Sequence, residues 1–221
     1  MNTKGHCYPK YIILQAVYFK LRFTLSYRDV EELMKIRGVI VDHATIQRWV
    51  YKFTPLIESE MKKIKGRVGA SWRLDETYIK VKGIWCYLYR AVDKLGNTVD
   101  FLLTRKRQRM SAQSFLIKAI DNNYRLRVIK IDKSSSNIAA IKVYNKRSFS
   151  KIKIRQCKYL NNIVEQDHRF IKWRIQNGLG FKSFESAKRT LSGIEVVNML
   201  RKNQMVKPGK SMFKSFCKLA G

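Results

Sequence analysis

The chain is short of acidic residues, with 16 Asp and Glu against 46 Lys and Arg in 221 residues. The formal net charge at pH 7 is +30, and the isoelectric point is near 10.2. So much charge of one sign repels itself and weakens a compact fold, so a polyanionic partner is the natural explanation. Composition alone leaves two classes of partner, nucleic acid and an anionic membrane surface.

Long hydrophobic runs are also missing. A membrane-spanning helix needs ~20 consecutive apolar residues, whereas the apolar stretch 11–19 is interrupted by Gln15 and followed by Lys20 and Arg22. No small-residue cleavage site follows this stretch, as a signal peptide would require. We therefore expect no membrane partner, a cytoplasmic location, and nucleic acid as the polyanion.

Cysteine and histidine are too sparse and too scattered for a zinc site. The chain has Cys7, Cys86, Cys157 and Cys217, with His6, His43 and His168. None of the cysteines forms a C-x-x-C pair, which excludes the usual zinc spacings. We expect all four cysteines to be free thiols in a reducing cytosol.

The chain does contain enough apolar surface for a packed core, since 45% of its residues are hydrophobic and 12% are aromatic. Its N-terminal part predicts three helices. The first covers residues 11–22, and the second follows Ser26 as N-cap and stops at Gly38. The third follows Asp42 as N-cap and ends at about Phe53.

Two helices joined by a short turn with glycine form the helix-turn-helix pattern. On the outer side of the later helix, Thr45, Gln47 and Arg48 are residue types that reach phosphates or base edges. A small three-helix bundle without DNA would show the same pattern, but the net charge favours DNA binding. Pro55 and the basic run 61–67 then predict a linker.

After residue 67 the periodicity changes to that of strands. The predicted strands are 71–81, 85–92, 98–103, 127–131 and 152–157, and the predicted helices are 111–120, 137–144, 161–174 and 186–201. This order predicts an α/β fold, a mixed sheet of three antiparallel strands followed by alternating helix and strand. The basic segment from residue 202 is expected to be a frayed end that contacts DNA.

One predicted strand carries an aspartate in its middle. Asp75 loses solvation there unless a metal ion, a cation or a set of donors compensates, and pairing with a nearby Lys or Arg is the plainer alternative. Asp132 follows the fourth strand, and Glu165 lies on a later helix. If the first and fourth strands are neighbours, both aspartates share one edge region, over which the helix can bring Glu165. Glu76 lies on the opposite strand face and is a poor ligand candidate.

Three convergent carboxylates among many cations suit two Mg²⁺ ions, which take hard oxygen ligands and leave positions open for phosphate and water. Two such ions activate the attacking oxygen and stabilise the leaving oxygen of a phosphodiester displacement. The remaining carboxylates are better explained by ordinary structural positions than by metal binding. Asp93, Asp100 and Asp121 are expected in turns or on the surface, and Asp167 in a cap or a local ion pair.

Long blocks of the sequence resemble the insertion-sequence-six family of bacterial transposases. WRLDETYIKVKG at 72–83 and YLYRAVD at 87–93 are similar to the family's first catalytic block, and NNIVEQDHRF at 161–170 is similar to its last. Residues 25–29, 41–50, 179–184 and 193–195 also match. The resemblance covers nearly the whole chain, from about residue 5 to 204.

This resemblance implies an RNase H-like catalytic core, preceded by an all-α helix-turn-helix domain. It implies Asp75, Asp132 and Glu165 as catalytic residues that bind two Mg²⁺ ions, with Mn²⁺ as a substitute. Lys172 is implied to contact terminal DNA, and Arg169 is a second candidate on that helix. The implied reaction cuts DNA at the ends of the element and frees a 3′-hydroxyl, which attacks target DNA directly.

The implied partners are double-stranded DNA of two kinds, terminal inverted repeats and target DNA. We expect a dimer or larger assembly on DNA, because two ends must be held together, and no protein partner is identifiable. The expected domains are residues 1–66 for helix-turn-helix and linker, 67–204 for the catalytic core, and 205–221 for a basic tail.

The spacing departs from the family's at one place. Only 32 residues separate Asp132 from Glu165, two fewer than the family usually has, with changes at 134–136 and 143–151. Two residues lost from a loop cost little closure entropy, whereas the same loss in a helix or strand displaces Glu165. Two alternatives therefore stay open, a decayed relic that binds element ends without strand transfer, and an RNase H-like nuclease selective for DNA structure.

Overall fold

The computed structural model describes residues 7–123, 126–132, 135–156, 162–176 and 180–221. The chain forms two compact units, which we call the helical unit (Met1–Gly66 with Ile171–Gly221) and the sheet unit (Arg67–Phe170). Within the described ranges, no helix is long and apolar enough to cross a membrane.

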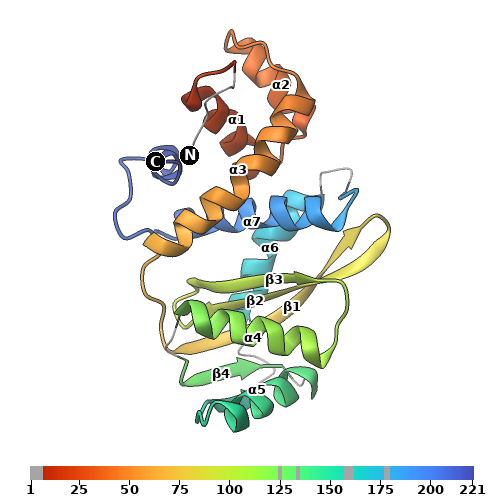
Figure 1. Ribbon diagram of the computed structural model, residues 1–221, viewed down its shortest axis with the longest axis vertical. Coiled ribbons are helices and arrows are strands. Elements are labelled where there is room, and N and C mark those ends of the chain that lie inside the picture. The colour runs from red at the N-terminus through yellow and green to blue at the C-terminus, as the bar shows by residue number, and fades with distance from the viewer. Residues whose placement is uncertain (1–6, 124–125, 133–134, 157–161, 177–179) are drawn as a thin grey trace. The chain divides into compact units, whose positions relative to one another are not determined.

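The helical unit opens with the three predicted helices (Figure 1). These are α1 (Lys10–Arg22), α2 (Tyr27–Ile36) and α3 (His43–Ile64), and the unit also holds α7 (Phe184–Arg201) and α8 (Met212–Lys218). Ser26 accepts from the Asp29 backbone N–H while the Asp29 carboxylate accepts from the Ser26 N–H, so a capping box begins α2. Gly38, with φ of 77°, follows the end of that helix. Both predicted helix signals are confirmed.

Helix α3 is longer than predicted, because it continues through Pro55 to Ile64. Proline has no N–H, so the carbonyl of Tyr51, four residues earlier, loses its donor within the helix. Arg189 of α7 supplies a replacement, since its Nη1 donates to the Tyr51 carbonyl at 3.0 Å. The helix also buries Phe53, Ile57 and Met61 on one face. The predicted stop near Phe53 is therefore wrong, because packing outweighs the local break.

The C-terminal segment is folded where a frayed end was predicted. Lys65 and Met205 form a β-bridge, and α8 begins at the N-cap Ser211. Tyr18 packs against Phe213 and Phe216, with ring centroids 5.2 and 5.3 Å apart. The aromatic residues inside this basic segment bury enough apolar surface to hold it in the helical unit.

The sheet unit is built on five strands within the described residues, in the spatial order β3-β2-β1-β4-β5. Strands β1, β2 and β3 are antiparallel, and β4 and β5 run parallel to β1. The strand bounds are Ser71–Val81, Ile84–Asp93, Thr98–Thr104, Val128–Ile131 and Lys153–Gln156, and the helices are α4 (Arg109–Asn123), α5 (Ser135–Arg147) and α6 (Asn162–Gln176), whose residues from Ile171 on belong to the helical unit. The predicted order of strands and helices is confirmed, and this sheet order is that of an RNase H-like fold.

The two faces of the sheet are covered by different helices (Figure 1). Tyr89 of β2 packs on Phe115 of α4, with ring centroids 5.9 Å apart. Its neighbour Arg90 bonds Asp167 of α6. Because successive side chains of a strand point to opposite faces, α4 and α6 lie on opposite sides of the sheet.

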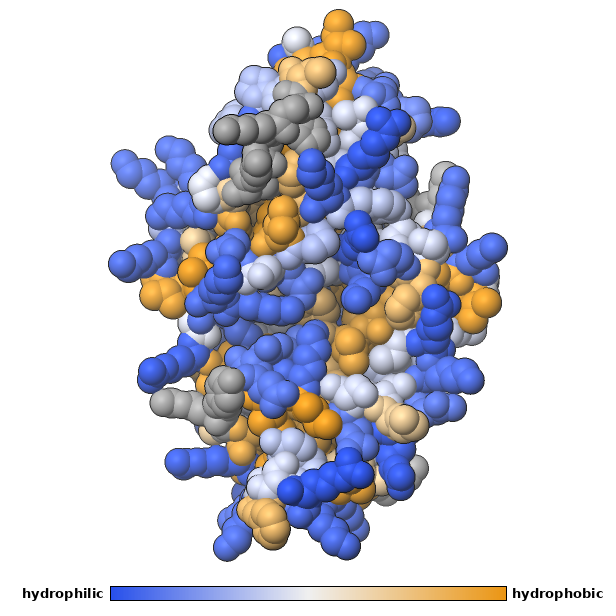
Figure 2. All heavy atoms as spheres, viewed as in Figure 1, coloured by the Kyte–Doolittle hydropathy of each residue, from blue (hydrophilic) through white to orange (hydrophobic). Residues whose placement is uncertain are grey.

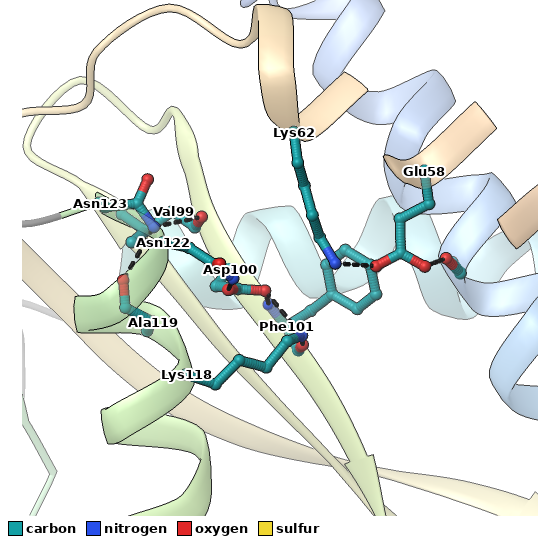
Figure 3. Close-up of polar contacts among 10 residues, drawn as sticks. Glu58, Lys62, Val99, Asp100, Phe101, Lys118, Ala119, Asn122 and Asn123 are labelled. Atoms are coloured by element: carbon teal, nitrogen blue, oxygen red, sulfur yellow. Dashed lines mark hydrogen bonds and ion pairs between the residues drawn. The ribbon is translucent and has the colours of Figure 1, made fainter. Parts of the chain in front are cut away.

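Two carboxylates predicted in turns or on the surface are buried. Asp100 is 4% exposed and accepts from Lys118 Nζ at 2.9 Å and from Asn122 Nδ2 at 2.6 Å (Figure 3). Asp93 is 1% exposed and accepts from the backbone N–H groups of residues 69, 95 and 97. Asp93 does organise the turn between β2 and β3, as predicted. Both carboxylates, however, are buried and accept hydrogen bonds from protein donors in place of water.

Candidate active site

The predicted aspartates lie at one end of two neighbouring strands. Strand β1 pairs with β4 in parallel, and the last pair in the register is Leu74 with Ile131. Asp75 is the next residue of β1 and Asp132 directly follows β4, so the chain places them beside each other where the pairing ends. The side chain of Asp75 is 23% exposed, and Asp132 is exposed. The predicted neighbourhood of the first and fourth strands is confirmed.

Helix α6 is held to this edge by two polar contacts. His168 Nε2 lies 3.2 Å from Asp75 Oδ2. Arg90 Nη2 donates to Asp167 Oδ2 at 2.6 Å, and both side chains are buried. Arg90 is also the cross-strand partner of Asp75 in the β1–β2 register. Asp167 thus pairs with a distant strand, and the expectation of a cap or local ion pair is wrong.

Glu165 lies one helical turn before His168. Residues three apart share a face of a helix and are separated by ~4.5 Å along its axis. Because His168 contacts Asp75, this spacing puts Glu165 on the side of α6 that faces the carboxylate edge. Glu165 is exposed, so its carboxylate is accessible to a ligand.

The three predicted carboxylates do not form a ligating set in the part of the chain that the structure describes. Among the described residues, no group of three or more His, Cys, Asp and Glu side chains is close enough to hold a metal ion. Their chemistry fits a divalent cation, because Asp75, Asp132 and Glu165 offer hard oxygen donors that are exposed or partly exposed. Their role as ligands stays a prediction.

Glu76 lies on the other face of β1, as expected. It forms an ion pair with Arg107, and its Oε2 accepts from Asn137 Nδ2 at 3.1 Å. Its side chain is 6% exposed. A buried carboxylate with two protein partners is a poor metal ligand. This agrees with the prediction from the sequence that Glu76 is a poor ligand candidate.

The predicted DNA contacts of the helix-turn-helix lie near the start of α3. Thr45 caps this helix together with Asp42, because its hydroxyl donates to Asp42 Oδ2 at 2.6 Å. Gln47 Nε2 lies 3.4 Å from the Tyr51 hydroxyl, and Arg48 is exposed. Gln47 and Arg48 are therefore better placed than Thr45 to reach DNA, and all three stay predictions.

Helix α6 and its surroundings are rich in cations. Arg169 and Lys172 are exposed. Arg174 donates to the carbonyl of Arg22 at the end of α1, and burial, followed by the charges of Arg22 and Arg201, lowers the pKa of Arg174 to about 10. The exposed cations of α6 suit phosphate contacts. On the face that Figure 2 shows, hydrophilic side chains predominate, with hydrophobic patches between them.

The thiols do not contribute a site among the described residues. Cys7, Cys86 and Cys217 are free, as predicted, and Cys157 lies outside the described residues. Burial raises the pKa of Cys86 and of Cys217. A raised thiol pKa disfavours the reactive thiolate.

The sequence analysis missed Arg90 and the role of His168. A signal for Arg90 was present, because the hairpin turn at Lys82 and Gly83 fixes a register that sets Arg90 opposite Asp75. An arginine inside an otherwise apolar strand also indicates a buried partner. The contact of His168 with Asp75 needs the packing of α6 on the sheet, which the sequence does not reveal.

The comparisons with known proteins concern the whole chain. A family model described as a DDE domain matches residues 69–204, more than half of the chain. The chain is 41% identical over 198 residues to the transposase for insertion sequence-like element IS431mec of Staphylococcus aureus, covering 88% of this chain and 86% of that protein. It is 40% identical, with the same coverage, to the transposase for insertion sequence element IS257 in transposon Tn4003 of Staphylococcus aureus.

Among solved structures, the chain is similar to the HTLV-2 integrase catalytic core domain in complex with magnesium. The identity is 14%, the TM-score is 0.48, and the match covers 71% of this chain and 100% of that chain. A structural similarity this weak is no further evidence for the fold, which rests on the order of the strands in the sheet.

Proposed function

We propose that this chain, which belongs to the DDE transposases of bacterial insertion sequences, cuts the ends of its own element and joins them to target DNA. The observation that carries the proposal is the β1–β4 register, which sets Asp75 and Asp132 side by side. The contact of His168 with Asp75 supports a position of Glu165, one helical turn earlier, near the same edge. Cleavage frees a 3′-hydroxyl at the element end, and this oxygen then attacks a target phosphodiester.

Asp75, Asp132 and Glu165 would hold two Mg²⁺ ions, with Mn²⁺ as a substitute. When bound, such ions activate the attacking oxygen and stabilise the leaving oxygen of the displacement. The protein's own contribution is positional. Arg90 and Asp167 form a buried ion pair between β2 and α6, and this contact fixes the turn of α6 that carries Glu165.

The DNA is held by cations outside the carboxylate edge. Arg169 and Lys172 are exposed on α6 and suit the phosphates of the terminal DNA. Thr45, Gln47 and Arg48 at the start of α3 suit contact with the terminal inverted repeats. In this proposal the domain division 1–66, 67–204 and 205–221 separates recognition from chemistry, and two copies or more hold the two ends together.

A binding-only relic is the second candidate. Two observations favour it, the Asp132–Glu165 interval with two residues fewer than the family usually has, and the absence of a ligating set among the described residues. The described parts of the interval form α5 and β5. A shortening inside these elements would displace Glu165, whereas one in a loop would not.

The test is a joining assay with full-length protein, a duplex that carries the terminal inverted repeat, and Mg²⁺ or Mn²⁺. We expect joined product from the wild type and a loss of ~10²–10³-fold or more in Asp75→Asn. Asp121→Asn is the matched control, because Asp121 is an exposed aspartate on α4. Equal activity of wild type and Asp75→Asn contradicts the catalytic proposal. Repeat binding without product at any metal concentration supports the relic.

A further inference from the structure

The end of the β1–β2 hairpin carries an exposed aromatic cluster that the proposed reaction does not use. Tyr78 is 48% exposed and Trp85 is 55% exposed. The Tyr78 ring centroid lies 6.2 Å from that of Trp85 and 5.3 Å from that of Tyr87. We call Tyr78, Trp85 and Tyr87, together with Lys80, the hairpin surface.

The hairpin surface lies on the sheet face opposite Asp75. The register pairs Tyr78 with Tyr87 and Lys80 with Trp85, so the four side chains share one face. Asp75 is an odd number of residues away from Tyr78 along β1 and therefore points to the other face. The cluster thus lies apart from the carboxylate edge, and a role of its own must explain its exposure.

Cations surround these rings. Lys80 Nζ lies 5.6 Å from the centre of the Trp85 ring, and Lys82 occupies the turn. Thr104 pairs with Tyr87 in the β2–β3 register, and the exposed residues Arg105 and Lys106 follow it. Residues 77–92 contain no Asp or Glu. A partner that suits this surface is an anion with flat apolar faces.

We propose that the hairpin surface binds unpaired bases of DNA, by stacking on Tyr78 and Trp85 while the lysines contact the phosphates. Aromatic rings within a basic groove bind single strands without base preference, because every base has a π-face. A second copy of the chain suits the surface less well. A symmetric contact would set patch against patch and bring Lys80 and Lys82 of both copies together.

The test compares a fluorescently labelled oligo-dT single strand with a duplex of equal length, by anisotropy, with full-length protein and no metal. We expect Trp85→Ala and Tyr78→Ala each to weaken single-strand binding by ~10-fold and duplex binding by less than ~3-fold. Trp85→Tyr retains a stacking ring and should restore most of the affinity. Phe149→Ala is the control, because Phe149 is a 94% exposed aromatic elsewhere in the sheet unit.

Three outcomes would overturn the proposal. These are unchanged single-strand binding in Trp85→Ala, an equal loss for single strand and duplex, and a dimer that Trp85→Ala dissociates without any change in DNA binding. Circular dichroism of each variant checks that it is folded. The result is independent of the proposed reaction, because the assay contains no metal and measures binding alone.

Discussion

The two faces of the sheet differ in the charged residues that they carry, although each buries both apolar and charged side chains. The face under α4 and α5 carries a core of apolar side chains that includes Trp72, Leu74 and Phe115. On the α6 face, the same strands present Arg73, Asp75 and Arg90. Buried charges contribute little net stability. The difference teaches that the face under α4 and α5 is mainly a hydrophobic core, whereas the α6 face combines apolar packing with the charged residues that we propose for the reaction.

The largest expected effect comes from breaking the Arg90–Asp167 pair. In Arg90→Met, Asp167 stays buried without its Arg90 partner, which should destabilise the protein by ~3–5 kcal/mol. Joining activity should fall as well, because the turn of α6 that carries Glu165 loses its anchor. Denaturant unfolding and the joining assay measure the two effects.

The double variant Arg90→Met with Asp167→Leu separates stability from function. Replacing both charges by apolar groups is often neutral or stabilising, so most of the stability should return. Joining activity should stay low if the pair positions α6. Full recovery of joining would show that the pair is only structural.

A core substitution on the opposite face should affect stability first. Phe115→Ala removes a fully buried ring from α4 and should cost ~3–5 kcal/mol in the free energy of unfolding. Under conditions where the variant is folded, its metal dependence should match that of the wild type. A changed metal requirement would contradict the division between the faces.

The smallest expected effect concerns Tyr89, which is buried on the apolar face. Its hydroxyl has no hydrogen-bond partner among the described residues, so Tyr89→Phe should change stability by less than ~1 kcal/mol and in the stabilising direction. Burial, with the nearby Glu76 charge, raises the pKa of Tyr89 to about 12. The folded state then holds this proton more tightly, so stability is lost as pH rises from 10 to 12. Tyr89→Phe should lose less in that window.

Much of the fold follows from local signals in the sequence. The N-caps Ser26 and Asp42 begin their helices. The turn at Lys82 and Gly83 sets the strand register in which Asp75 pairs with Arg90. The order of strands and helices along the chain also followed from the alternation of their patterns. Signals that act within a few residues are readable without tertiary structure.

The missed features all depend on contacts between distant segments. Helix α3 passes Pro55 because Arg189, more than a hundred residues later, donates to the freed carbonyl. Asp100 and Asp167 are buried because partners on α4 and β2 compensate their charges. Local patterns indicate solvated carboxylates at such places, and only the fold shows which cation lies opposite.

The central claim is that the α6 face of the sheet holds divalent metal through Asp75, Asp132 and Glu165. A calorimetric titration of full-length protein on its terminal-repeat duplex, with Mg²⁺ and then Mn²⁺, tests it most directly. We predict saturable binding to the wild type and to Asp121→Asn, and loss of that binding in Asp75→Asn, Asp132→Asn and Glu165→Gln. Equal metal binding by all five proteins, or none by the wild type, would contradict the claim.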